Sequence, residues 1–464
     1  MKYSWIWALT LGAVAWGEPA WKVNSPLLPL VAPPGTHHHL EIEGPSGNRP
    51  RATCGPHQVP LEEVRPGVYQ GRFPVTSGPL KVDDEVLGEC LAQPCDEVFQ
   101  VGAEGAVFRT GPSSDYDRLT PLPPGVRLQV LQRQGDYLQV TPPLGWVRRS
   151  EGSLLPPETS LGQPLLQSVQ VGASQLRLRL GTACAWQVSL SPERRTLVLD
   201  LPGVAMAMGQ MSHAANAHRI SSVQLQPYAG GTRLEVVLNQ RLWGYRLAWT
   251  GQDLLLQLSP APTIHPRRPL QGLTVALDPG HGGEDKGTVG LGRGVMEKDL
   301  NLRCSLALAE ELRAAGARVV LTRDSDRQVV GDEASAAEEL EGRVRKAEQA
   351  GAQLFLSIHH NARPDVKDGR VSHGTHIYYY QPQSGPLARA LAAPLARSMG
   401  EPGWMHLWRS FHVIRQTSMP SVLLEYNFLS NPTLEAGMLA RPDYPRRTAR
   451  AVRQGLEDFL RQRL

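Results

Sequence analysis

Strict alternation of apolar and polar residues dominates the middle of the chain, between residues 163 and 260. Seven short runs there follow this pattern, among them LRLRL, WQVSL and TLVLDL. A period of two places apolar side chains on one face of a strand and polar side chains on the other. Residues 163–260 are therefore predicted to form a β-sandwich-like domain whose strands each have one solvated face.

The two segments before this region also favour strands, although their patterns are less regular. Residues 18–98 carry short alternating runs separated by proline, glycine and serine, which predicts a small β-rich module. Residues 99–152 carry strands at closer spacing, which predicts a small barrel of about five strands. Three adjacent histidines, His37, His38 and His39, cannot share one face of a strand or helix. We therefore interpret them as part of a solvated loop rather than a metal site.

The pattern changes after residue 270, where apolar strands alternate with helices. Three prolines mark residues 261–269 as a linker, and residues 270–464 are predicted to form an α/β domain. Strands are predicted at 274–277, 318–323, 353–358, 375–380 and 421–424, and helices at 298–315, 338–350, 386–398 and 444–464. The predicted fold is multidomain: N-terminal all-β modules are followed by a C-terminal α/β domain with a mixed sheet flanked by helices.

The first 17 residues have the pattern of a secretory signal. Lys2 precedes an apolar core, and Ala15-Trp16-Gly17 is a small-x-small cleavage site, so residues 1–17 are interpreted as a signal peptide. The apolar run is short for a membrane span, so we expect an exported protein without an integral membrane segment after cleavage; an uncleaved anchor is the alternative. The net charge of +4 gives no reason to expect nucleic-acid binding.

Five cysteines are present, and three of them, Cys54, Cys90 and Cys95, lie in the first β-rich module. In an oxidising compartment we expect a disulfide such as Cys54 to Cys90 or to Cys95, and the odd count leaves at least one thiol free. Cys304 lies in an apolar helical pattern and is predicted to be a buried small hydrophobe.

Four candidate functional positions fall at strand ends or at a helix start: His281, Glu297, His359 or His360, and Glu425. In open α/β folds, ligands bind at the carboxyl edge of the sheet. Two histidines and a carboxylate meet the ligand count of a catalytic zinc that keeps one position open. A further carboxylate can then take a proton from water and return it to a leaving amine. Each residue alone is a weak signal, and their joint occurrence on one sheet edge predicts a zinc hydrolase of amides.

Two details of this region narrow the prediction. The glycines around His281 fit neither nucleotide-binding pattern, so a phosphate-binding loop is disfavoured. His359 and His360 point to opposite faces of a strand, so only one of them is expected to bind the metal, and periodicity does not choose between them.

Residues 271–464 resemble the zinc-dependent N-acetylmuramoyl-L-alanine amidases, which hydrolyse bacterial peptidoglycan. The matching segments are LDPGHGG at 277–283, Glu297 with Asn301 and Leu302, LTRD at 321–324, SIHHNA at 357–362, PSVLLE at 420–425 and FLSN at 428–431. The resemblance implies that His281, Glu297 and His359 bind Zn²⁺ and that Glu425 is the catalytic carboxylate. It also implies cleavage of the amide between N-acetylmuramic acid and L-alanine of the stem peptide.

The N-terminal modules carry weaker resemblances. Residues 99–152 resemble a bacterial SH3-type domain through residues 109–116, LPPG at 122–125 and GWV at 145–147. Residues 163–260 resemble the AMIN localisation domain found ahead of many envelope amidases. These resemblances imply binding to peptidoglycan in the periplasm or cell envelope, although the small barrel could equally be a spacer, and any protein activator is unknown.

The chain also departs from the family pattern. His360 stands where the family usually has a small residue, and we interpret it as lining the rim of the site, with a contact to substrate or to a second ion as alternatives. His373 and His376 could face the cleft and are left unassigned. Only 65 residues lie between His359 and Glu425, so we expect no self-inhibitory helix of the kind found in division amidases. Control is then expected from the N-terminal domains or from localisation.

Two alternative functions are also compatible with parts of this pattern. A zinc peptidase acting within the stem peptide would need the same metal chemistry. An inactive cell-wall-binding protein would not need all four functional positions, so their presence argues against it.

Overall fold

The computed structural model describes residues 21–34, 37–214, 218–228, 230–362, 374–400 and 404–463. The predicted signal peptide at residues 1–17 and the unassigned His373 lie outside these residues. The chain divides into two compact units, Met1–Tyr116 with Arg127–Leu161, and Asp117–Val126 with Gly162–Leu464.

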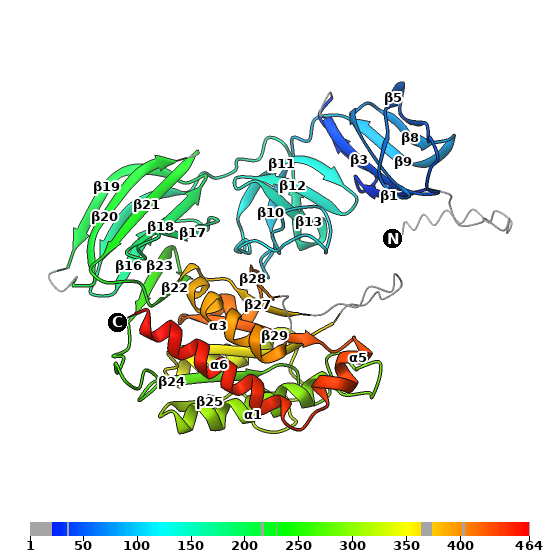
Figure 1. The fold of residues 1–464 in the computed structure, drawn as a ribbon. Helices are drawn as coiled ribbons and strands as arrows, with labels where there is room; N and C mark the ends of the chain where they lie inside the picture. Colours follow the sequence, from blue (N-terminus) through cyan, green and yellow to red (C-terminus); the bar gives the residue numbers. More distant parts are fainter. Residues whose placement is uncertain are drawn as a thin grey trace, which may run out of the picture. The chain divides into compact units, whose positions relative to one another are not determined.

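The first unit is built from short strands, as the sequence predicts. Its strands are β1 (Lys22–Ser25), β2 (Leu30–Ala32), β3 (His37–Glu43), β4 (Ala52–Cys54), β5 (His57–Val59), β6 (Glu62–Arg65), β7 (Val68–Pro74), β8 (Gly78–Val82), β9 (Glu85–Ala92), β10 (Val98–Val101), β11 (Arg127–Gln134), β12 (Tyr137–Thr141), β13 (Gly145–Arg148) and β14 (Gly152–Leu155), with a 3-10 turn η1 (Arg149–Glu151). Strand β2 pairs with β9 on one side and with β11 on the other. One sheet therefore runs from the first β-rich segment into the segment that follows it. Figure 1 draws the strands of these two segments in blue and cyan.

Two predictions for the first unit are wrong. His37, His38 and His39 do not lie in a loop: they begin strand β3 and pair with Pro74, Phe73 and Arg72 of β7. The expected disulfide is also not formed, because all five cysteines are free and buried. The Cys54 thiol donates instead to the carbonyl oxygen of Thr76 at 3.7 Å, and the Cys95 thiol donates to that of Val31 at 3.8 Å.

The second unit begins with two packed sheets. Their strands are β15 (Leu165–Val171), β16 (Gln175–Arg179), β17 (Gln187–Leu190), β18 (Thr196–Pro202), β19 (Ala205–His213), β20 (Ile220–Tyr228), β21 (Gly231–Leu238), β22 (Gly244–Thr250) and β23 (Asp253–Ser259). The orders are β19-β15-β16-β23-β22 and β17-β18-β21-β20. Alternate residues of β18 and β21 are buried, so the period-two prediction holds. Strands β15 and β19 fall outside the seven predicted runs, and β19, with the sequence AMAMGQMSH, has no β-branched or aromatic residue.

The C-terminal domain has a mixed sheet flanked by helices, as predicted. Its strands are β24 (Thr274–Pro279), β25 (Arg318–Leu321), β26 (Leu354–Asn361), β27 (Thr375–Tyr379), β28 (Trp404–Trp408) and β29 (Ser421–Phe428). Its helices are α1 (Glu297–Ala314), α2 (Ala336–Gln349), α3 (Gly385–Met399), α4 (His412–Gln416), α5 (Pro432–Leu434) and α6 (Tyr444–Arg461), with a 3-10 turn η2 (Pro382–Ser384) and a π-helical turn η3 (Glu435–Leu439). The sheet order is β25-β24-β26-β29-β27-β28, and β27 runs antiparallel to β29.

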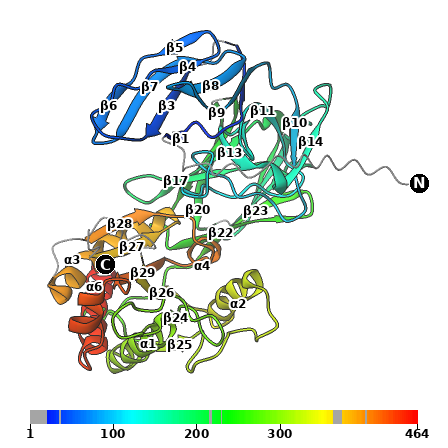
Figure 2. The same cartoon turned by 90° about the vertical axis from the view of Figure 1, so that its right-hand side faces the viewer.

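Helices cover both faces of this sheet. Helices α1, α3 and α6 enclose the larger core, where Leu308, Leu391 and Leu456 pack with Leu356 of β26. Helices α2 and α4 cover the other face, and Figure 2 shows them on the side opposite α3 and α6. Helix α2 starts at a capping box in which the Ser335 hydroxyl accepts from the Glu338 amide. In the described part of the chain, we find no helix with the length and apolar character needed to cross a lipid bilayer.

The two-sheet region contributes a side chain to the C-terminal core. Trp243 belongs to the same apolar cluster as α1 and α6, and its ring centroid lies 6.0 Å from that of Phe459. Its indole N–H donates to the carbonyl oxygen of Gln353, which directly precedes β26, at 3.0 Å. The linker predicted at 261–269 therefore does not separate two independent cores.

Candidate metal centre

Strands β24, β26 and β29 are parallel neighbours, so their carboxyl ends lie at one edge of the sheet. The chain leaves β24 at Pro279 and enters a glycine-rich loop that carries His281 in the left-handed region, with φ 61°. Gly280 allows the loop to pass close to β26: a Cβ atom there would lie 2.2 Å from Cε1 of His359. This close approach brings the histidine of the loop beside the histidine of the strand.

His281, Glu297 and His359 form a cluster whose ligand atoms all lie within 4.8 Å of one another. The Glu297 Oε1 atom is 3.2 Å from His281 Nε2 and 3.0 Å from His359 Nδ1. A tetrahedral zinc with ligands at about 2.0–2.1 Å would separate its ligand atoms by about 3.3 Å. Two nitrogen donors and one carboxylate at these separations therefore fit a three-ligand zinc site with one free position.

Hydrogen bonds orient each of these side chains. His281 Nδ1 lies 2.8 Å from the Asp285 carboxylate, which leaves Nε2 free to face the cluster. Burial lowers the pKa of His281, but the neighbouring carboxylates of Glu297 and Asp285 outweigh it and raise this pKa to about 9. In the folded chain without metal, the imidazole therefore takes up the proton that a metal ion would displace.

Glu297 is the first residue of α1 and is buried. The amide of Thr288 donates to its Oε2 atom at 3.0 Å, and the side-chain amide of Asn301 donates to Oε1 at 3.2 Å. Burial alone would raise the pKa of Glu297, but hydrogen bonds and charge from His281 and His359 hold it far below its usual value. The carboxylate is thus held ionised and fixed, as a metal ligand must be.

Glu425 lies next to the cluster on the neighbouring strand. It pairs in register with His359 of β26 and with His376 of β27, so the three side chains share one face of the sheet. Its Oε2 atom is buried without a hydrogen-bond partner among the described residues. Burial and the charge of Glu297 raise the pKa of Glu425 to about 7, against the opposing effect of His359 and His281.

The structure distinguishes the two adjacent histidines, and the rim position predicted for His360 is wrong. His360 is 2% exposed and points into the core on the α1 and α6 side. Its Nδ1 atom lies 2.7 Å from Asn301 Oδ1 and its Nε2 atom 3.1 Å from the Tyr444 hydroxyl. Because the same Asn301 donates to Glu297, His360 helps to fix the Glu297 carboxylate through Asn301. The pairing of β26 with β29 is irregular between His359 and Asn361, as is common beside functional sites.

His376 is placed beside Glu425 but outside the three-residue cluster. Its Nδ1 atom lies 3.0 Å from the side-chain nitrogen of Asn361 and 3.1 Å from the Tyr378 hydroxyl. Its ring packs edge-on against Phe428, with centroids 5.5 Å apart. Burial and, to a lesser extent, Arg409 lower the pKa of His376, so the neutral form is favoured.

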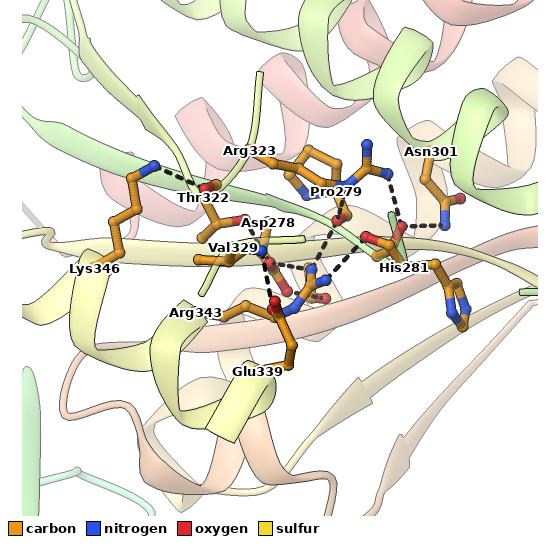
Figure 3. Close-up of polar contacts among 12 residues, drawn as sticks. Asp278, Pro279, His281, Asn301, Thr322, Arg323, Val329, Glu339, Arg343 and Lys346 are labelled. Atoms are coloured by element: carbon orange, nitrogen blue, oxygen red, sulfur yellow. Dashed lines mark hydrogen bonds and ion pairs between the residues drawn. The ribbon is translucent and has the colours of Figure 1, made fainter. Parts of the chain in front are cut away.

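Two buried arginines hold the loop that carries His281 (Figure 3). Arg323 donates to the carbonyl oxygens of Pro279 at 3.0 Å and of Gly280 at 2.9 Å. Arg343 of α2 donates to the carbonyl oxygens of Pro279 at 2.8 Å and of His281 at 2.9 Å. The loop backbone therefore has its polar groups satisfied by side chains rather than by a neighbouring strand.

Asp278 balances the charge of Arg343 inside the domain. The two side chains form an ion pair at 2.9 Å and are 1% and 7% exposed. The hydroxyls of Thr322 and Ser357 donate to the remaining lone pairs of Asp278 at 2.6 Å and 2.8 Å. Burial would raise the pKa of Asp278, but Arg343 and these hydroxyls hold it below its usual value.

Sequence reasoning assigned no role to Asp285, Arg323 or Arg343. Asp285 follows His281 by four residues within one loop, and this spacing alone could have suggested a carboxylate partner for the histidine. Arg323 lies in the LTRD segment at 321–324, which was noted only as a family match. Arg343 left no comparable signal, because it lies far along the chain from the carbonyl groups that it binds.

The fold and the cluster define a class of protein: an α/β enzyme domain with a His-Glu-His metal-capable site at the carboxyl edge of its sheet. Residues 275–458 match the family model described as N-acetylmuramoyl-L-alanine amidase. YqiI of Bacillus subtilis (strain 168), an uncharacterized protein, is 34% identical over 223 residues, which are 47% of this chain and 100% of YqiI. The germination-specific N-acetylmuramoyl-L-alanine amidase of the same strain is 32% identical over 196 residues, 40% of this chain and 80% of the relative.

A solved structure shares this similarity. The catalytic domain of CwlV, an N-acetylmuramoyl-L-alanine amidase from Bacillus (Paenibacillus) polymyxa var. colistinus, is 35% identical, covering 40% of this chain and 98% of that chain with a TM-score of 0.36. From the sequence matches, the chain belongs to the N-acetylmuramoyl-L-alanine amidase family. It is a peptidoglycan hydrolase, and the predicted enzyme class is confirmed.

Proposed function

We propose that the chain is a zinc-dependent N-acetylmuramoyl-L-alanine amidase in which His281, Glu297 and His359 hold the metal and Glu425 moves the proton. The observation that carries this proposal is the convergence of two imidazoles and one carboxylate, from three separate elements, within 4.8 Å. Two nitrogen donors and a carboxylate suit zinc better than magnesium or calcium, which prefer oxygen ligands.

Zinc, when bound, supplies Lewis-acid chemistry: it polarises the amide carbonyl and acidifies a neighbouring water molecule. Glu425 Oε2 accepts a proton from the water molecule while the water oxygen attacks the lactyl carbonyl carbon. The carbon–nitrogen bond then breaks, and Glu425 returns the proton to the nitrogen of L-alanine. The products are a free lactyl carboxylate on the sugar and a stem peptide with a free amino group.

The rest of the chain supports this chemistry by positioning the site. Asp285 selects the tautomer of His281 that presents Nε2 to the metal. Asn301, itself bonded to His360, holds Oε1 of Glu297. The arginines Arg323 and Arg343 fix the loop backbone on either side of His281.

The N-terminal residues are proposed to bring the enzyme to peptidoglycan. We infer that residues 1–17 direct export and that residues 99–152 and 163–260, which resemble SH3-type and AMIN domains, hold the enzyme at the cell wall. The β-strand content of both regions supports this proposal. The enzyme would then work in the periplasm or cell envelope, with peptidoglycan as its partner and without an internal inhibitory helix.

Product analysis tests the proposed bond specificity. Purified peptidoglycan treated with the full chain should release stem peptides with a free L-alanine amino group, and a chelator should stop the release. Free amino groups from residues inside the stem peptide, with the lactyl bond intact, would show a zinc peptidase instead. Binding of peptidoglycan with no release of either kind would show an inactive wall-binding protein.

A further inference from the structure

The second unit contains a groove of about 670 Å³ that the metal centre does not use. One wall is the hairpin between β17 and β18, and the other is formed by the end of β27, the start of α3 and the end of β28. Its lining includes Leu190, Arg194, Tyr379, Tyr380, Arg389 and Trp408.

The groove lies away from Glu425. His376 is the register partner of Glu425, and Tyr380, the residue directly after β27, follows His376 by four residues. At about 3.3 Å per residue, this separates the two positions by about 13 Å. A ligand of the groove would therefore leave the metal centre accessible.

The hairpin that presents Arg194 is fixed by its own hydrogen bonds. The Arg194 amide donates to the carbonyl oxygen of Ser191 at 2.8 Å, and the Ser191 hydroxyl accepts from the Thr196 amide at 3.2 Å. The Leu242 amide donates to the carbonyl oxygen of Arg194 at 2.8 Å. These bonds hold Arg194 in the left-handed conformation, with φ 60°, that turns the chain toward the groove.

The opposite wall is aromatic and equally fixed. The rings of Tyr380 and Trp408 lie 5.2 Å apart with an angle of 31°, and the Trp408 indole donates to the carbonyl oxygen of Tyr380 at 2.9 Å. Rigid aromatic faces with a few polar groups beside them are the usual lining of small-molecule sites. Such faces accept the C–H groups of a sugar ring, while the polar groups orient its substituents.

Two arginines, Arg194 and Arg389, bring positive charge to the lining of the groove. Among the described residues, neither arginine forms an ion pair with a carboxylate. Arg241 and Arg463 lie outside the lining and act on Arg194 and on each other only through charge. Burial, then Arg241 and Arg389, lower the pKa of Arg194, and burial, then Arg194 and Arg241, lower that of Arg463 to about 9. Arg463 itself donates to the carbonyl oxygen of Leu242 and lies over the rings of Trp243 and Phe459. A bound carboxylate would relieve this repulsion and can be held by two guanidinium groups at once.

We propose that this groove binds an N-acetylmuramic acid residue whose lactyl carboxylate is free, with the sugar ring against Tyr380 and Trp408 and the carboxylate between Arg194 and Arg389. This ligand is a product of the amidase reaction, because hydrolysis of the amide leaves one free carboxylate on each N-acetylmuramic acid residue that loses its stem peptide. The inference rests on that reaction. A groove with this preference retains the enzyme on glycan from which stem peptides have already been removed.

Equilibrium dialysis of the full chain tests the proposal with three small probes. N-acetylmuramic acid should bind saturably. N-acetylglucosamine, which lacks the carboxylate, and lactate, which lacks the sugar, should each bind at least tenfold more weakly than N-acetylmuramic acid. Arg194→Gln combined with Arg389→Gln should weaken N-acetylmuramic acid binding at least tenfold. Arg345→Gln, which changes an exposed arginine outside the groove, should leave it unchanged.

Several results would overturn the proposal. Equal binding of lactate would show a general anion site, and equal binding of N-acetylglucosamine would show that the arginines are not involved. Binding that is lost in His281→Ala but retained in the double arginine variant would place the ligand in the metal centre. An unchanged melting temperature of the double variant shows that it is folded, and hydrolysis, which is assayed separately, tests the amidase reaction by itself.

Discussion

The guanidinium group of Arg343 donates a hydrogen bond of 2.9 Å to the backbone carbonyl oxygen of His281. Arg343 belongs to α2, which covers one face of the sheet, whereas His281 lies in a loop at the sheet edge (Figure 3). A helix that contributes no metal ligand thus fixes the backbone of a residue in the metal centre. The left-handed conformation of His281 is maintained by this and the neighbouring hydrogen bonds.

Replacing Arg343 with methionine should therefore affect stability and metal binding together. The change leaves the buried carboxylate of Asp278 without its ion pair, and breaking a buried pair costs about 3–5 kcal/mol. Urea unfolding measures this loss, and competition with a chromogenic chelator measures the affinity for zinc. Arg345→Met, on the exposed face of the same helix, should change neither. Wild-type stability in Arg343→Met would show that the pair does not fix the loop.

His360 should prove to be a supporting residue rather than a ligand. In His360→Ala, Asn301 loses a side-chain partner, and the Tyr444 hydroxyl is left buried without one. Each unsatisfied buried group costs about 1–3 kcal/mol, so unfolding should require less urea. The variant should still bind one zinc ion per chain, measured by elemental analysis after dialysis. Loss of the ion with no loss of stability would identify His360 as a ligand.

Glu425→Gln should separate catalysis from metal binding. The glutamine cannot accept a proton, and loss of a general base typically lowers the rate by about 10²–10⁴-fold. Because Glu425 is not part of the His-Glu-His cluster, the zinc content should remain that of the wild type. Glu310→Gln, at an exposed position of α1, is the matched control. A rate within a few-fold of the wild type would remove Glu425 from the mechanism.

The Asp253 carboxylate should stabilise the two-sheet region by an amount that falls at acidic pH. Arg177 and Arg179 hydrogen-bond to it at 2.8 Å and 3.1 Å, and chiefly the Arg177 bond lowers the pKa of Asp253 in the folded chain. A lowered folded-state pKa gives stability that is present above the unfolded pKa, about 3.9, and is lost as the pH falls through the folded pKa. The melting temperature of the wild type should exceed that of Asp253→Asn at pH 6, and this difference should shrink below about pH 4. A difference that is constant with pH would contradict the assignment.

Much of the C-terminal domain could be predicted from the sequence, because its elements have strong local signals. The strand before His281 and the helix that opens at Glu297 were predicted within two residues of their observed bounds. The cluster of His281, Glu297 and His359 was expected because parallel strands bring their carboxyl ends together. Periodicity did not choose between His359 and His360, since both faces of β26 are covered and the apolar pattern is the same on either side. The family resemblance implied His359, and His359 is the histidine of β26 that lies in the cluster.

Other features depend on contacts that leave no local pattern. The three histidines at the start of β3 do not need to share one face, because successive residues of a strand point to opposite faces. They lie in a strand because this segment pairs with β7, and the local sequence does not indicate that pairing. Trp243 lies directly before β22 of a different sheet and enters the C-terminal core, and no periodicity near residue 243 indicates its partner. Arg343 has the spacing of an ordinary amphipathic helix, and only its distance to Asp278 shows that it balances a buried charge.

The central claim is that one zinc ion, bound by His281, Glu297 and His359, is required for amide hydrolysis. The most direct measurement is the zinc content of the purified full chain and of His281→Ala, Glu297→Ala and His359→Ala, each followed by a peptidoglycan hydrolysis assay. We predict one zinc ion per wild-type chain, loss of both metal and activity in each variant, and recovery of wild-type activity when zinc is restored after chelation. Stoichiometric zinc in all three variants, or full activity of the metal-free wild type, would contradict the account.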